Sequence, residues 1–238
     1  MRCLEMTLRE PAANLALDEA LLELCEANPA VEVLRFWEPR DYFVVLGYAN
    51  RAEREANLAA CAKAGICVYR RCSGGGTVLQ GPGCLNYSLV LHTAGGSQHL
   101  YGVAEARSQI MSRHQQALAA MLGRPVEVAG ISDLALDGRK FSGNAQRHKR
   151  EALIFHGTFL LGFDIAMMDL ALPMPTYQPD YRQRRSHGQF VTNLGVPAAR
   201  VKAVLRQAWS AAEPWDSPPE IPARLLEKYA SQEWNMKF

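Results

Sequence analysis

The 238-residue sequence lacks long apolar runs, and its first residues do not form an apolar leader. No stretch approaches the roughly 18 uninterrupted apolar residues that a membrane-spanning helix needs. The opening residues 1–5 are followed by charged residues rather than by the apolar core of a signal peptide. The sequence therefore predicts neither a membrane span nor secretion, and we expect a cytoplasmic protein.

Paired cysteines are also missing. The six cysteines form no C-x-x-C pair, and no histidine accompanies them at metal-ligating spacing. A zinc site or a disulfide framework would show such patterns. We therefore expect reduced thiols in or near the core. Cys72 and Cys84 stand apart because they lie inside or just after a glycine-rich segment and could face a ligand there.

The sequence has little excess charge of one sign. Its 26 Lys and Arg residues face 24 Asp and Glu residues, which leaves a net charge of +2. So small a charge does not predict a nucleic-acid partner. The local exception is the basic segment from Tyr181 to His187, for which two interpretations stand. It is either a solvated loop or a contact surface for a phosphate or an acidic protein face.

Length and periodicity indicate one enzyme-sized domain. With 48% hydrophobic residues, the chain can bury a substantial core. We expect a single catalytic domain over 1–238, with its core at about 14–194, closing helices at about 198–238 and no accessory domain after them. Helical periodicity occurs at 14–27, 52–64, 103–122, 198–212 and 223–234, and strand-like runs occur at 31–37, 42–46, 66–70, 85–92, 126–128, 133–136 and 151–161. This order predicts an α+β fold, with a possible hairpin between the first two strands and an irregular stretch at 172–180.

The run from Arg70 to Val78 combines two arginines, a serine and three consecutive glycines directly after a strand-like segment. Glycine permits close backbone approach, so successive N–H groups can converge on the oxygens of an anion. Arg71 can add a bidentate, permanently charged fork. The alternative is a glycine-rich turn beside surface arginines.

A second segment, Gly138 to Gln146, places Lys140 in what looks like a tight turn of small residues. Activation of a carboxylic acid by ATP brings two anions together, so the site needs cations between them. A lysine can act there as a compact point charge that bridges the carboxylate and the α-phosphate. The alternative is an exposed turn lysine.

Four motifs follow one another along the chain: R-R-x-S-G-G-G-x-V from Arg70, S-D-L from Ser132, G-R-K-x-S-G-x-A-Q from Gly138 and H-G-T-x-L-L from His156. In this order and spacing they resemble the lipoate-protein ligase family, within the wider group of biotin/lipoate ligases and octanoyltransferases. The resemblance covers about residues 14–194. It implies a biotin/lipoate ligase-like catalytic domain with a mixed central β-sheet flanked by helices.

The resemblance also implies the reaction and its residues. Lipoate would be activated by ATP and Mg²⁺ to lipoyl-AMP and transferred to a lysine of a lipoyl carrier domain, on an E2 subunit or a glycine-cleavage H-like protein. Lys140 is the implied catalytic residue. The implied ATP and adenylate ligands are Arg71, Ser73, Gly74, Gly75, Gly76, Thr77, Val78, Leu79, Asp133 and Lys140. The implied lipoate ligands are Arg71, Gly76, Lys140, Ser142, Gly143, Ala145, His156, Gly157 and Thr158.

Two of these residues keep a second interpretation. Asp133 either orients the nucleotide or an Mg²⁺ ion, or is simply a carboxylate at the start of a strand. His156 lies in an apolar strand, where a histidine is more often structural, so we expect it to bind or position rather than to act as a general base.

The sequence departs from the ligase pattern in two places. Ligases commonly continue after the glycines with H-D-x-G-N, whereas Gln80 to Cys84 read Q-G-P-G-C and look more like the H-G-P-G-Q of octanoyltransferases. Family ligases often carry an accessory domain after the catalytic core, so the resemblance leaves open a separate partner subunit for ATP activation here. The alternatives are an acyltransferase that forms a thioester on Cys72 or Cys84, with a thiol pKa lowered beside Arg71, and a non-catalytic lipoate- or nucleotide-binding subunit.

Overall fold

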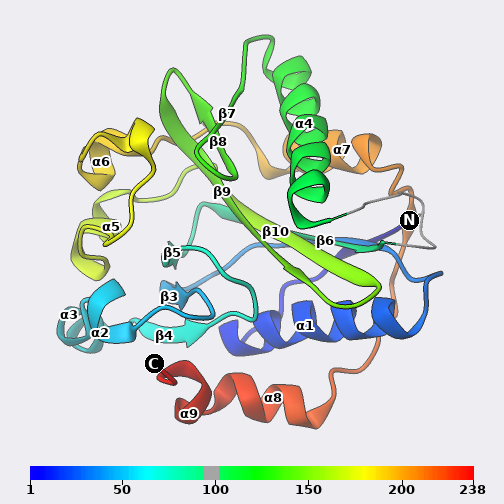
Figure 1. Ribbon diagram of the computed structural model, residues 1–238, viewed down its shortest axis with the longest axis horizontal. Helices are drawn as coiled ribbons and strands as arrows, with labels where there is room; N and C mark the ends of the chain where they lie inside the picture. The colour runs from blue at the N-terminus through cyan, green and yellow to red at the C-terminus, as the bar shows by residue number, and fades with distance from the viewer. Residues whose placement is uncertain (94–101) are drawn as a thin grey trace.

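The computed structural model describes residues 1–93 and 102–238, and an eight-stranded sheet forms its centre (Figure 1). The strand order is β11-β1-β2-β6-β10-β9-β8-β7. β1 pairs in parallel with β2 and β11, whereas the other neighbours pair antiparallel. The bounds are β1 Arg2–Glu5, β2 Val33–Trp37, β6 Cys84–His92, β7 Glu127–Ala129, β8 Asp133–Leu136, β9 Arg139–His148, β10 Ala152–Leu160 and β11 Glu213–Pro214. The predicted α+β fold with a mixed sheet is confirmed.

Helices cover both faces of this sheet, α1 (Pro11–Ala27) on one and α4 (Val103–Leu122) with α7 (Ala198–Ala208) on the other (Figure 1). Successive strand side chains point to opposite faces. In β6, Val90 accordingly joins the core beneath α1, while Leu89 joins the core beneath α4 and α7. α4 ends as the sequence predicts, because Gly123 takes a left-handed C-cap with φ 65°.

A second sheet of three strands, ordered β4-β3-β5, lies beside the large one. It consists of β3 (Phe43–Leu46), β4 (Cys67–Arg70) and β5 (Val78–Gln80). The expected hairpin between the first two strand-like runs is wrong, because β2 belongs to the large sheet and β3 to the small one. Every residue of both strands is buried. Both are inner strands, because β2 lies between β1 and β6 and β3 lies between β4 and β5.

Two further expectations are corrected. The helix expected at 52–64 is divided into α2 (Ala52–Glu55) and α3 (Leu58–Ala64), because the Asn57 side chain accepts from the backbone N–H of Ala60 and caps the second helix. The closing helices are also shorter than expected: α7 ends at Ala208, and α8 (Ala223–Ala230) is separate from α9 (Gln232–Asn235). The stretch 172–179 is irregular, as predicted.

The C-terminal helices hold the end of β4, where the glycine-rich loop begins. The buried Arg70 guanidinium donates to the carbonyls of Trp234 and Asn235 in α9, at 3.1 and 3.0 Å. It also donates to the carbonyls of Gly47, Tyr48 and Asn50. One buried arginine thus ties three segments together beneath the loop. No helix of the described residues is long and apolar enough to cross a membrane.

Candidate active site

A cavity of about 110 Å³ lies among β5, β9, β10 and the chain that follows α5 (Ala166–Ala171). Its other wall includes α6 (His187–Phe190). Among the predicted site residues, seven line it: Thr77, Val78, Leu79, Lys140, Ser142, Gly143 and Thr158. Its apolar lining comes mainly from Leu79, Phe141, Leu160, Met168, Leu172, Phe190 and Val191. The cavity therefore joins an apolar slot to a lysine.

Lys140 is the second residue of β9, not part of a turn. The turn lies just before it, at Asp137 and Gly138, whose φ values are 50° and 68°. These positive values suit a two-residue hairpin loop, and Gly and Asp are the residues that tolerate them. The prediction that Lys140 lies within a tight turn is thus wrong, because the turn ends just before it. A strand fixes Lys140 more firmly than a turn would.

The Lys140 ammonium is held by Asp133, at 2.7 Å between Nζ and Oδ1. The other carboxylate oxygen, Oδ2, accepts from the Tyr181 hydroxyl at 2.7 Å. Burial, with Asp133 alongside, raises the pKa of Tyr181. A Cβ added at Gly143 would lie 2.7 Å from Lys140 Nζ, so the lysine side chain occupies the space that a larger residue would fill. Tyr181 is therefore a site residue that the motif analysis missed.

The glycine loop between β4 and β5 is organised by Arg71. Its Nη2 donates to the carbonyls of Gly74 and Gly76, and its Nε donates to Ser73 Oγ at 3.0 Å. Burial lowers the pKa of the guanidinium to about 10. No carboxylate of the described residues pairs with it. The loop therefore carries a buried, uncompensated positive charge behind three exposed glycines.

A buried chain of polar groups continues from the loop to α1. Ser73 Oγ lies 2.6 Å from His156 Nε2, and His156 Nδ1 lies 3.4 Å from Asp18 Oδ2. Arg35 Nη1 lies 2.6 Å from Asp18 Oδ1. Burial alone would raise the pKa of Asp18, but Arg35 and His156 outweigh it and hold the pKa below its ordinary value.

These hydrogen-bonded polar groups hold His156 behind Ser73, where it does not line the cavity. His156 is therefore placed to position the loop. Asp18 and Arg35 were missed because neither belongs to a motif. A signal exists in the sequence for Arg35, which is a charge within the otherwise apolar run 33–37, whereas Asp18 stands beside Glu19 in an amphipathic pattern. Buried charges are rarely tolerated unless they are paired.

The remaining predicted residues surround the loop rather than the cavity. Gly74, Gly75 and Gly76 are exposed, and Ala145 packs near Gly75. Gly157 lies opposite Asn144 in the pairing of β9 with β10. Loop and cavity meet at Thr77, which lines the cavity directly after the glycines.

The basic segment is mostly used inside the protein. Arg182 is 5% exposed, lines the cavity and lies 4.7 Å from the ring centroid of Phe190. Arg185 donates to the carbonyls of Gly138 and Tyr181. Only Arg184 is exposed among the three arginines. The segment thus braces the cavity wall and offers little free charge for docking.

The two thiols beside the glycine loop, those of Cys72 and Cys84, are not activated for nucleophilic attack. Burial raises the pKa of Cys72 to about 11 and that of Cys84 to about 12. The expected lowering beside Arg71 is therefore wrong, because loss of water raises the pKa of both thiols and, for Cys72, outweighs the lowering by Arg147. The exposed cysteine of the described residues is Cys67, on β4.

No group of three or more His, Cys, Asp or Glu residues suited to a metal occurs in residues 1–93 and 102–238. Both carboxylate oxygens of Asp133 are already engaged, by Lys140 and by Tyr181. The described residues therefore do not build a metal site of their own around Asp133. Mg²⁺ is usually bound through substrate phosphates and only one or two carboxylates.

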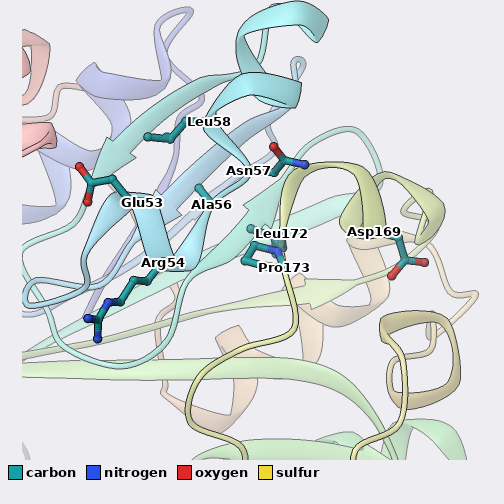
Figure 2. Close-up of a pocket in the computed structure, with 8 residues that line it drawn as sticks. All are labelled: Glu53, Arg54, Ala56, Asn57, Leu58, Asp169, Leu172 and Pro173. Carbon is teal, nitrogen blue, oxygen red and sulfur yellow. The ribbon is translucent and has the colours of Figure 1, made fainter.

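A larger, more open hollow of about 420 Å³ lies between α2–α3 and α5 (Figure 2). It shares Leu172 and Pro173 with the cavity. Figure 2 shows that the charged ends of Glu53, Arg54 and Asp169 lie apart and do not converge on one point. This hollow shows no arrangement of catalytic groups.

Comparisons with known proteins bear on this site. The family model for the lipoyl protein ligase A/B catalytic domain matches residues 10–207. Lipoate-protein ligase LplJ of Bacillus subtilis is 32% identical over 160 residues, which are 67% of this chain and 45% of the relative. A putative lipoate-protein ligase A of Aeropyrum pernix is 34% identical over 161 residues, 68% of this chain and 58% of the relative. The chain thus spans about half the length of these ligases.

The octanoyltransferase LipM of Brevibacillus brevis is similar over a longer stretch, at 24% identity across 95% of both chains. Among solved structures, a bi-partite lipoate protein ligase of Thermoplasma acidophilum aligns with a TM-score of 0.79 at 23% identity, covering 99% of this chain and 95% of that one. A lipoate-protein ligase A bound with ATP aligns with a TM-score of 0.73 at 24% identity, covering 99% of each chain. These structures show the shared fold.

Proposed function

Because the chain belongs to the lipoyl protein ligase A/B catalytic-domain family, we propose that it is a lipoate-protein ligase. In the proposed reaction a lipoate carboxylate oxygen attacks the α-phosphorus of ATP, pyrophosphate leaves, and lipoyl-AMP forms. A lysine amine of a carrier domain then attacks the acyl carbonyl and displaces AMP. The carrier is an E2 lipoyl domain or a glycine-cleavage H-like protein, and the Thermoplasma ligase was studied with its E2 lipoyl domain.

The observation that carries this proposal is the placement of Lys140 at the cavity. Its ammonium is held on a strand, by Asp133 and over Gly143, beside an apolar slot. A positive charge held there stabilises the negative charge that builds on the α-phosphate as pyrophosphate leaves. It also reduces the repulsion between the two reacting anions, because it lies between them.

The glycine loop supplies the second positive element. The exposed backbone of Gly74 to Gly76 and the uncompensated charge of Arg71 behind it favour an anion at the loop. We assign Ser73, Thr77, Val78, Leu79 and Asp133 with the loop to the nucleotide. Mg²⁺ would arrive with the nucleotide phosphates, where it supplies charge neutralisation.

The second half-reaction needs an approach for the carrier lysine rather than a protein nucleophile. The exposed loop at Gly74 to Gly76 offers that approach. The raised pKa values of Cys72 and Cys84 support a route without an acyl-thioester on the enzyme. In this proposal His156 does not touch the reactants. It positions the glycine loop through its hydrogen bond with Ser73.

Octanoyl transfer is the second candidate, and the full-length similarity to LipM favours it. It would require one of the buried thiols to become accessible and ionised. A ligase that needs a separate accessory subunit is a variant of the first proposal.

The proposal is tested by the intact mass of a lipoyl carrier domain after incubation with this protein, lipoate and Mg-ATP. Lys140→Ala is compared with Lys63→Ala, which removes an exposed lysine on α3. A parallel reaction supplies octanoyl-acyl carrier protein without ATP. We expect a lipoyl mass gain that needs ATP and Lys140 but not Lys63. A gain only from octanoyl-acyl carrier protein would establish the transferase instead, and no gain in either reaction would indicate a missing subunit or a non-catalytic protein.

A further inference from the structure

The C-terminal helices α8 and α9 supply no residue to the proposed chemistry, yet they contact the strand that leads into the glycine loop. They begin at residue 223, beyond the residues 10–207 that the family model matches. α8 packs on α1, and α9 packs on the end of β4 (Figure 1). The family match therefore assigns these helices no role, and any role has to be argued from their contacts.

α9 holds both backbone groups of Arg70, the last residue of β4. Trp234 Nε1 donates to the Arg70 carbonyl at 2.9 Å, and the Arg70 N–H donates to Asn235 Oδ1 at 2.9 Å. β4 forms an edge of the small sheet, and the N–H of the next residue, Arg71, donates inward to the Leu46 carbonyl of β3. Consecutive residues of a strand direct their backbone groups to opposite sides, so those of Arg70 face outward, where an edge strand has backbone left to pair. Two side chains of α9 supply that pairing.

The residue held in this way stands directly before the residue that organises the loop. Arg71 follows Arg70, and its guanidinium donates to the carbonyls of Gly74 and Gly76. The direction in which the backbone leaves Arg70 therefore fixes where the charge of Arg71 and the exposed glycines lie.

A second set of contacts joins α8 to the same loop. The buried Glu19 of α1 accepts from Lys228 Nζ at 2.6 Å and from the Tyr229 hydroxyl at 2.8 Å, both on α8. Its other carboxylate oxygen lies 3.2 Å from Arg147 Nη1, which also donates to the Cys72 carbonyl at 3.3 Å. Glu19 thus links α8, through Arg147, to a carbonyl within the loop.

A third contact runs through Tyr48. The Tyr48 N–H donates to the Ser73 carbonyl at 2.8 Å. The Tyr48 ring lies 5.8 Å from that of Trp234, and its hydroxyl accepts from Lys237 Nζ at 3.1 Å. The C-terminal segment therefore supports the loop and the residue before it at three positions, 70, 72 and 73.

We propose that α8 and α9 position the glycine loop for anion binding, with Trp234 as a positioning residue that acts through Arg70. The inference rests on the proposed function, in which the loop holds the nucleotide. Loss of the Trp234 hydrogen bond at the outer edge of β4 then weakens ATP binding. A merely structural role would cost stability and leave the affinity for ATP unchanged.

The test compares Trp234→Phe with Trp209→Phe. Each change keeps an aromatic ring and removes one indole N–H donor, because Trp209 Nε1 donates to His114 Nε2 at 2.8 Å in the core beneath α4 and α7. Urea unfolding shows whether each variant folds, and calorimetric titration of the full chain with ATP gives the affinity. We expect Trp234→Phe to bind ATP about fivefold more weakly than wild type, the effect of one neutral hydrogen bond, and Trp209→Phe to bind it as wild type does.

Ser231→Ala is a second variant that leaves the indole in place. Ser231 Oγ accepts from the Trp234 N–H and caps α9, so its removal loosens the helix and should weaken ATP binding in the same direction. Lipoate-dependent pyrophosphate exchange adds a kinetic measurement on the same proteins. We expect the KM for ATP to rise about fivefold in Trp234→Phe with little change in kcat, because Lys140 lies on β9 of the large sheet rather than on the loop.

The inference is overturned if Trp234→Phe binds ATP as tightly as wild type, or if Trp209→Phe weakens binding equally. If Trp234→Phe does not fold, wild-type affinity in Ser231→Ala overturns it. The exchange measurement separates the two levels. ATP binding by wild type without exchange refutes the ligase, and the titrations still decide whether Trp234 positions the loop; no ATP binding by wild type refutes both.

Discussion

The buried Asp18 and Arg35 pair should be worth far more to stability than an exposed pair of the same geometry. Arg35 has no exposed side-chain surface, and its Nη1 lies 2.6 Å from Asp18 Oδ1. Asp18→Asn keeps the shape of the side chain but leaves a buried guanidinium without a counter-charge. Breaking such a pair from one side costs about 3 to 5 kcal/mol. We expect a loss of this size in the free energy of unfolding.

The exposed pair of Asp137 and Arg124, at 2.5 Å, is the matched control. Its two side chains are 85% and 46% exposed, so water screens the attraction. Asn also tolerates the positive φ of position 137. Asp137→Asn should therefore cost below about 1 kcal/mol. Urea unfolding followed by circular dichroism measures both variants, and equal losses in the two would refute the reasoning from burial.

The pH dependence gives a second check on the same pair. The folded-state pKa of Asp18 lies below its ordinary value, so the unfolded chain binds the proton more readily. The stabilisation is then fully present above the unfolded pKa, about 3.9 for Asp, and is lost as the pH falls through the folded value. The stability difference between wild type and Asp18→Asn should shrink on acidification. A difference that stays constant from neutral to acid pH would contradict the assignment.

Three further outcomes follow from the site. Gly143→Ala places a Cβ 2.7 Å from Lys140 Nζ, so we expect adenylation to slow at least about tenfold while the circular dichroism spectrum stays that of wild type; normal turnover would show that the lysine position is not critical. Tyr181→Phe removes the donor to Asp133 and should cost about 1 kcal/mol in urea unfolding, and an unchanged midpoint would argue against that bond. Cys84→Ala should keep lipoyl transfer, because burial raises the pKa of this thiol to about 12; loss of transfer in a folded variant would favour the thioester route.

Much of the fold follows from local patterns. The helix Val103–Leu122 begins and ends where periodicity and Gly123 predict it, since those signals depend on nearby residues. The hairpin expected after β2 fails because strand pairing depends on distant partners. β2 and β3 are buried along their whole length, so no alternation of buried and exposed residues shows that they belong to different sheets.

The site was predictable where it lies in a motif and not where tertiary contacts build it. Lys140 was predicted as a site residue and lies at the cavity, but its turn was placed too late, because Ser142 and Gly143 look like turn residues while they belong to a strand. Tyr181 and Asp18 come from segments far from the motifs in sequence.

The most direct test of the central claim is lipoate-dependent exchange of labelled pyrophosphate into ATP. It reports the first half-reaction alone, without a carrier domain. We expect exchange that requires lipoate, persists in Lys63→Ala and disappears in Lys140→Ala. Acyl transfer from octanoyl-acyl carrier protein with no exchange in wild type would contradict it.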